Sequence, residues 1–148
     1  YTVRNYFVSL NKENHMEIEI KFRAWDKERN LMKYPKLWDN TMPSNWDLHY
    51  NLMQYTGLKD KNGNGNDIFE GDIFEAIYKD CPDWFTILGK ETTTITVKAV
   101  VVFKFGKFVI EMMHPQHKEL VYSDLFEFLK NEQKVVIGNI YENPEMLK

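Results

Sequence analysis

The stretch Gly57-Leu-Lys-Asp-Lys-Asn-Gly-Asn-Gly-Asn-Asp-Ile-Phe-Glu-Gly-Asp72 lies near the middle of the 148-residue chain and separates two β-rich halves. Residues 60–66 contain three asparagines and two glycines, which adopt positive φ angles easily and pack poorly. We therefore predict an exposed loop or hairpin tip there. Glu70-Gly71-Asp72 then interrupts the β pattern that follows, which predicts a bend or bulge.

Before this stretch, residues 17–25 alternate between apolar and charged side chains. One side carries Ile18, Ile20, Phe22 and Ala24, and the other carries Glu17, Glu19, Lys21 and Arg23. A period of two with one apolar side predicts a half-buried strand whose charged side faces solvent. Residues 31–34 predict a short second strand and residues 51–56 an extended segment, with an irregular loop between them.

After the stretch, residues 67–78 resume the β pattern, and residues 92–105 alternate more regularly than any other part of the chain. The sequence predicts a two-residue hairpin loop at Gly106-Lys107, followed by strands at 108–113, 118–122 and 135–140. Ser123–Leu129 predicts one short helix, with Ser123 as its N-cap. The expected fold class is mostly β with minor α.

Three motifs occur in a specific order along the chain. They are residues 21–26 (KFRAWD), residues 53–63 with 68–73 (MQYTGLKDKNG and IFEGDI), and residues 136–145 (VIGNIYENPE). Over residues 16–147 this pattern resembles the YopX family of phage and prophage proteins. The resemblance implies an SH3-like β-barrel towards the C-terminus, a β-rich N-terminal part, and a phage-encoded protein in the cytoplasm of a bacterial host. The family has no established activity, so the resemblance assigns no functional residue.

Three segments are expected. Residues 1–15 read as a leader carried over from cloning or upstream read-through, because His15-Met16 is a common junction and Met16 begins the first alternating segment. Residues 16–56 form the N-terminal β-rich region, and residues 57–148 form the SH3-like barrel that the resemblance implies. A single compact unit is the alternative to this division.

The composition of the chain argues against several classes of function. The formal net charge of −3 argues weakly against broad nucleic-acid binding, which needs a basic surface. The single cysteine, Cys81, excludes an internal disulfide and fits a reducing compartment. No apolar run approaches the roughly 20 residues of a membrane span. We expect no cofactor and no membrane partner.

Three patterns resemble reactive sites, and each fails in its detail. Asp60, Asn62, Asn64 and Glu70 match part of a calcium loop, but the bidentate glutamate comes one place early and the flanks are strands. His114 and His117 lack a third metal ligand nearby in sequence. Cys81 lies between acidic neighbours that oppose a thiolate. We therefore expect neither a metal site nor catalysis.

Two surfaces remain as binding candidates. Trp38, Trp46 and Trp84 lie in predicted loops, and aromatic anchors dominate protein interfaces, although the same side chains also pack loops onto a core. Lys98, Lys104 and Lys107 mark a possible nucleic-acid face, with only Glu91 opposing them in sequence. We expect a non-enzymatic module that binds a host or phage protein. Nucleic-acid binding, a small-molecule enzyme and self-association through free strand edges are the alternatives.

Overall fold

The computed structural model describes residues 20–35, 46–60, 65–79, 94–115, 117–130 and 134–148. Within them the chain is mostly strand, which confirms the predicted fold class. The elements are β1 (Phe22–Asp26), β2 (Leu31–Lys33), α1 (Trp46–His49), β3 (Tyr50–Lys59), β4 (Asp67–Phe69), β5 (Asp72–Lys79), β6 (Thr94–Lys104), β7 (Lys107–Met113), β8 (Leu120–Asp124), α3 (Leu125–Lys130), β9 (Val136–Asn139) and the 3₁₀ helix η1 (Pro144–Leu147).

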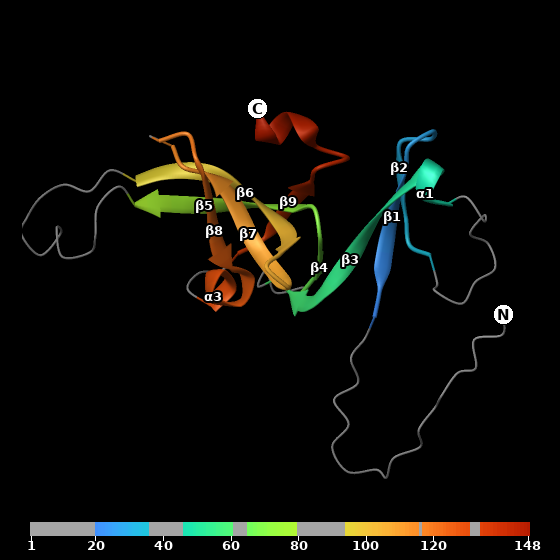
Figure 1. Cartoon of the computed structure of the whole chain (residues 1–148), viewed down its shortest axis with the longest axis horizontal. Helices are drawn as coiled ribbons and strands as arrows, with labels where there is room; N and C mark the ends of the chain where they lie inside the picture. Colours follow the sequence, from blue (N-terminus) through green and yellow to red (C-terminus); the bar gives the residue numbers. More distant parts are fainter. Residues whose placement is uncertain (1–19, 36–45, 61–64, 80–93, 116, 131–133) are drawn as a thin grey trace, which may run out of the picture.

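The N-terminal sheet has the order β2-β1-β3-β4, and its strands pair antiparallel. Its long strand β3 pairs with β1 at one end and with β4 at the other, so it connects the two parts of the molecule (Figure 1). Gly57, at φ 82°, lies where the β3–β4 register shifts between Tyr55 and Lys59. The predicted boundary between residues 56 and 57 therefore falls inside a strand.

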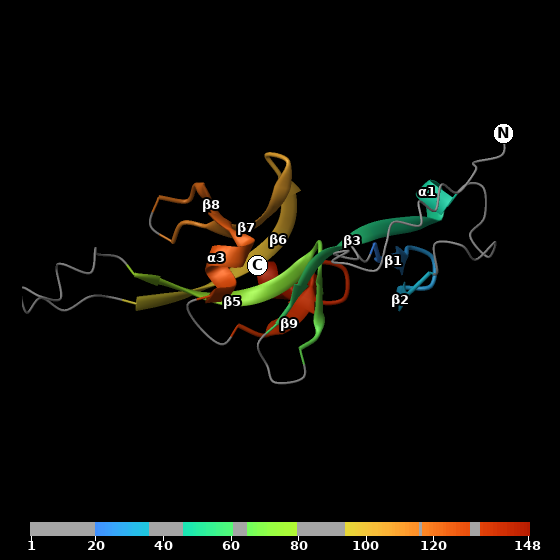
Figure 2. The ribbon, with the colours of Figure 1, turned by 90° about the horizontal axis from the view of Figure 1, so that it is seen from below.

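The C-terminal sheet has the order β8-β7-β6-β5-β9 and curls into a half-barrel (Figure 2). Alternate residues of β5, β6 and β7 point into its core, where α3 adds two buried leucines because its apolar residues recur at helical spacing. The fully or nearly fully buried core residues are Ile68, Phe74, Ala76, Ala99, Val101, Ile110, Leu125 and Leu129. The finer SH3-like assignment stays a prediction.

A second apolar cluster lies on the N-terminal sheet and contacts the segment that follows β9. Met53, Tyr55 and Phe69 are buried in it, and Trp25 and Tyr141 pack against them. The rings of Trp25 and Tyr141 stack with centroids 6.0 Å apart. A residue of β1 is thus held against the segment that follows β9, so the N-terminal sheet contacts both ends of the C-terminal half.

The charged side of β1 differs from the prediction. Arg23, predicted to face solvent, is only 6% exposed. The strand alternates as expected, but its charged side is covered by the second half of the chain, where Arg23 meets a carboxylate. Alternation along one strand identifies two sides, and it does not show which side another sheet will cover.

Two local predictions shift by one residue. The two-residue loop of the β6–β7 hairpin is Phe105-Gly106, since Lys104 pairs with Lys107 and both loop residues have positive φ angles of 56° and 75°. This is the geometry of a type I′ turn. Asp124 rather than Ser123 caps α3, because its Oδ1 accepts hydrogen bonds from the backbone N–H groups of Phe126 and Glu127 at 3.0 and 3.2 Å.

Helix α1 lies within the segment that was predicted to be an irregular loop. Its single turn is too short for a periodic signal in sequence. No helix in the described ranges is long and apolar enough to cross a membrane.

Candidate functional site

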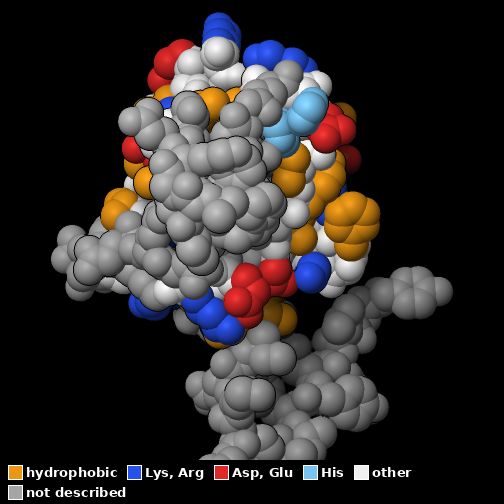
Figure 3. Space-filling model, turned by 90° about the vertical axis from the view of Figure 1, so that its left-hand side faces the viewer, with side chains coloured by type: hydrophobic (Ala, Val, Ile, Leu, Met, Phe, Trp, Pro, Cys, Tyr) orange, Lys and Arg blue, Asp and Glu red, His pale blue; other side chains and the backbone are white. Residues whose placement is uncertain are grey.

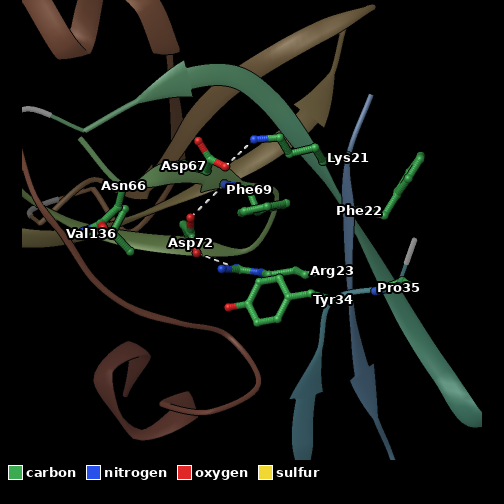
Figure 4. A pocket seen from close by; sticks show the side chains of 10 residues that line it. All are labelled: Lys21, Phe22, Arg23, Tyr34, Pro35, Asn66, Asp67, Phe69, Asp72 and Val136. Carbon is green, nitrogen blue, oxygen red and sulfur yellow. Dashed lines mark hydrogen bonds and ion pairs between the residues drawn. The ribbon is translucent and has the colours of Figure 1, made fainter. Parts of the chain in front are cut away.

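A cleft of about 470 Å³ opens where β1 meets β4, β5 and the start of β9 (Figure 4). It exists because β3 carries the N-terminal sheet past the half-barrel, which leaves a space between the two sheets. The lining residues are Lys21, Phe22, Arg23, Tyr34, Pro35, Asn66, Asp67, Phe69, Asp72 and Val136.

A buried ion pair crosses the back of the cleft. Arg23 of β1 donates from Nη2 to Oδ1 of Asp72, the first residue of β5. The other carboxylate oxygen of Asp72 accepts a hydrogen bond from the backbone N–H of Phe69 at 2.8 Å. The guanidinium also lies over the Phe69 ring, 4.9 Å from its centroid. The pair therefore fastens β1 to the β4–β5 bend, which the sequence predicted at Glu70-Gly71-Asp72.

The carboxyl of Asp72 titrates in an unusual range. Burial raises its pKa from 3.8 to about 6, and the charge of Arg23 and the Phe69 N–H hydrogen bond offset only part of that rise. The folded protein consequently holds this proton more tightly than the unfolded chain between these two pH values. The contribution of Asp72 to stability is therefore fully present below about pH 4 and is lost as the pH rises through 6.

We expect the Asp72→Asn variant to remove this pH dependence. Relative to the wild type, its free energy of unfolding should rise by about 3 kcal/mol between pH 4 and pH 7, because each unit of pKa shift corresponds to about 1.4 kcal/mol. Urea denaturation of both proteins across this range provides the measurement. A constant difference between them would show that Asp72 titrates like an exposed aspartate.

A second ion pair lies nearer the mouth of the cleft. The Nζ of Lys21 lies 2.7 Å from Oδ2 of Asp67, and this contact lowers the pKa of Asp67. The other oxygen, Oδ1, is buried without a hydrogen bond and lies 3.5 Å from the ammonium of Lys59. The two ion pairs leave the cleft close to neutral.

The geometry of the Arg23–Asp72 pair suits a structural role, in which it holds the two sheets together, better than a catalytic role. Asp72 has the raised pKa of a general base, but it is 1% exposed and both of its oxygens already accept hydrogen bonds. A base that cannot reach a substrate proton cannot serve a reaction in the cleft.

Exposed aromatic side chains gather at the β6–β7 turn, which projects from the half-barrel in Figure 2. Phe103, Phe105 and Tyr122 are 52%, 77% and 36% exposed. Phe105 meets Tyr122 edge to face at 5.5 Å, and Phe103 meets the half-buried Phe108 at 5.2 Å. We call Phe103, Phe105, Phe108 and Tyr122 the aromatic tip.

The three lysines predicted as a nucleic-acid face lie on the outer side of the same sheet, and each has a carboxylate partner. Lys98 pairs with Glu75, Lys104 with Glu111, and Lys107 with Asp124. From the sequence, only Glu91 was predicted to oppose these lysines. Their carboxylate partners were missed because they lie on neighbouring strands, not at neighbouring positions in the sequence. Figure 3, which views the molecule from the left-hand side of Figure 1, shows acidic, basic and hydrophobic side chains mixed on that face.

The remaining predicted site residues are placed as follows. Asp60 is buried, and its two carboxylate oxygens accept hydrogen bonds from the backbone N–H groups of Asn66 and Val136 at 2.9 and 3.3 Å. The rest of the calcium pattern is only partly described, since Asn62 and Asn64 lie outside the described residues while Glu70 forms the bend before β5.

The other candidates named from the sequence are a cysteine and three tryptophans. Cys81, Trp38 and Trp84 lie outside the described residues, and Trp46 begins α1.

His114 and His117 lie close together at the end of β7. Their rings are 4.5 Å apart, and the backbone N–H of His117 donates to Nδ1 of His114 at 3.1 Å. His114 is buried. Among the described residues, no group of three or more His, Cys, Asp or Glu side chains is placed to hold a metal ion.

Sequence reasoning did not identify Asp72 or Phe105 as site residues. The signal for Asp72 was present in the predicted bend, but its partner Arg23 is 49 positions away. The signal for Phe105 was its place in a hairpin turn, where asparagine or glycine is usual. Because the predicted loop was shifted by one residue, Phe105 was assigned to the strand and not to the turn.

Fold and surface together define a two-sheet, mostly β protein in which, among the described residues, aromatic side chains are exposed at a hairpin tip. A family model described as "YopX protein" matches residues 36–148. The chain belongs to the YopX protein family, as the three motifs indicated. Among curated proteins, no sequence matches the chain.

Proposed function

We propose that this protein is a non-enzymatic binding module that docks onto another protein through the aromatic tip. The observation that carries the proposal is Phe105, which is 77% exposed at a φ angle of 56°. For a residue other than glycine, a left-handed conformation costs about 1–2 kcal/mol. A large apolar ring that stays mostly exposed in such a turn buries little surface on folding, which favours a role in recognition.

A protein partner is favoured over nucleic acid by the charges around the aromatic tip. Lys104 and Lys107 flank Phe105, but Glu111 and Asp124 neutralise them, and the whole chain carries a net charge of −3. Phosphate binding would first have to break these ion pairs. An aromatic cluster edged by balanced charges is instead typical of the centre and rim of a protein interface.

Family membership supports the wider setting of the proposal. We place the protein among phage or prophage accessory proteins that act in the cytoplasm of the bacterial host, with a host or phage protein as its partner. Trp38, Trp46 and Trp84 remain additional candidates for the same interface. Small-molecule catalysis is the weaker alternative, since the carboxylate with the raised pKa in the cleft is sequestered by Arg23.

The Phe105→Asn variant separates recognition from folding. Asparagine tolerates positive φ, so the variant should be as stable as the wild type or up to about 1 kcal/mol more stable. Loss of a central aromatic anchor costs about 2 kcal/mol or more of binding free energy, which corresponds to roughly a 30-fold loss of affinity. Immobilised wild type and variant would be compared in nuclease-treated host lysate by quantitative mass spectrometry.

Leu48→Asn provides the matched control, because Leu48 is 69% exposed on α1 in the N-terminal half. A protein retained by the wild type and by Leu48→Asn, but lost with Phe105→Asn, supports the proposal. Equal retention by all three proteins would contradict it. Material that disappears when nuclease is added would favour nucleic acid as the partner, and size-exclusion chromatography of the free protein would detect self-association.

A further inference from the structure

A second hollow, separate from the aromatic tip and from the cleft, lies between η1 and the half-barrel. Its volume is about 430 Å³, and its walls come from the start of β6, the β7–β8 connection and η1. Figure 1 shows η1 and the β7–β8 connection on the same upper side of β6. We call this hollow the basic groove. Strand β7 runs from the aromatic tip at Lys107 to the basic groove at Met113.

The charge of the basic groove is unusual for an acidic chain. Lys98, Lys118 and Lys148 line it, and none of the described residues that line it is acidic. Lys98 has Glu75 as its partner, whereas no ion pair to another described residue involves the ammonium of Lys118 or Lys148. The exposed side chains of Glu119 and Glu145 are close in sequence but do not line the groove. The ammonium groups of Lys118 and Lys148 are therefore available to a ligand, whereas Glu75 shares that of Lys98.

The floor of the basic groove is aliphatic. Ile95, Met113, Met146 and Leu147 contribute to it, and none of the lining residues that the structure describes is aromatic. Methionine side chains adapt to partners of varied shape, which suits a peptide side chain. Binding of single-stranded nucleic acid relies on aromatic rings that stack with bases, and the groove offers none. Among polyanions, this floor favours a peptide over an oligonucleotide.

We propose that the basic groove binds a short acidic segment of a partner protein, in which carboxylates face Lys98 and Lys118 and an aliphatic side chain enters between Met113 and Met146. The position of Lys118 fits this role. It has a φ angle of 58° in the turn before β8, so a lysine replaces the asparagine or glycine that this geometry favours. This site does not depend on the aromatic tip and requires its own test.

The test uses the full chain and a fluorescein-labelled peptide of alternating glutamate and leucine, with binding followed by fluorescence anisotropy. We expect saturable binding that weakens as salt is added, because exposed charges are screened. The double variant Lys98→Gln/Lys118→Asn should bind about tenfold more weakly, since two exposed ion pairs are lost. Lys107→Gln is the matched control, because it removes a paired lysine at the aromatic tip, outside the groove.

A charge-reversed variant keeps the test decisive if a substitution perturbs folding. Lys98→Glu/Lys118→Glu should lose the glutamate–leucine peptide and gain binding to a lysine–leucine peptide, a switch that an unfolded protein would not show. No binding of the acidic peptide by the wild type would overturn the proposal. An equal loss with Lys107→Gln, or tighter binding of an oligothymidylate than of the peptide, would also overturn it.

Discussion

The Arg23→Met variant should lose about 3–5 kcal/mol of the free energy of unfolding at pH 7. Asp72 is 1% exposed, and without the guanidinium its charge would remain in the back of the cleft with one backbone hydrogen bond. Removing one partner of a buried ion pair typically has this cost, since the remaining charge is desolvated and uncompensated. Methionine retains most of the buried stem, so the loss reports on charge more than on volume.

The pH dependence of this loss provides an internal check. In the variant, Asp72 can escape the penalty by binding a proton, so the loss should be smaller at pH 5 than at pH 8. Urea denaturation at both values measures it. Lys21→Met is the matched control, because the Lys21–Asp67 pair is partly exposed and should contribute less than about 1 kcal/mol. Equal losses for the two variants would contradict a special role for the Arg23–Asp72 pair.

Local patterns predicted much of the half-barrel. The alternation in residues 92–105 placed Val97, Ala99 and Val101 on the side that packs into the core. Spacing predicted the helix at the end of β8, with its two buried leucines. Such predictions succeed because the spacing of apolar residues along a single strand or helix distinguishes its apolar side from its polar side. The interrupting Glu70-Gly71-Asp72 was likewise readable as a bend, and Gly71 adopts a φ angle of 81° there.

The cleft could not be predicted in the same way. Its walls combine residues 21–23, 34–35, 66–67, 69, 72 and 136, which come together because β3 pairs with both β1 and β4 and the chain then turns into β5. The carboxylate partners of Lys98, Lys104 and Lys107 came from adjacent strands for the same reason. Pairings between distant segments determine whether a charged side chain is solvated, paired or buried. The periodicity of apolar residues along the sequence does not show which distant segments pair.

These observations suggest a division of roles within the fold. The Arg23–Asp72 pair and the Trp25–Tyr141 stack both join the N-terminal sheet to the C-terminal half, at separate points. The aromatic tip and the basic groove both lie on the half-barrel, at opposite ends of β7. Because both proposed binding surfaces lie on the same sheet, β7 itself fixes their relative orientation, which lowers the entropy that would be lost on binding.

The Phe74→Ala variant should lose about 3–5 kcal/mol of the free energy of unfolding, by a mechanism different from that of Arg23→Met. Phe74 is fully buried in the half-barrel and meets Phe128 edge to face at 5.7 Å, so truncation removes apolar contact and leaves a cavity. The loss should not vary between pH 5 and pH 8, because no charge is exposed. Urea denaturation with an unchanged slope would attribute the shift to the native state.

Phe126→Ala is the control for this prediction, since Phe126 is 54% exposed on α3 and should cost less than about 1 kcal/mol. The number of transitions is equally informative. If the two sheets unfold together, as their shared contacts through β3 suggest, both Phe74→Ala and Arg23→Met should shift one cooperative transition. If Phe74→Ala instead exposes a separate earlier transition, the half-barrel folds as a unit of its own, and the predicted division near residue 57 describes the energetics better than a single compact unit does.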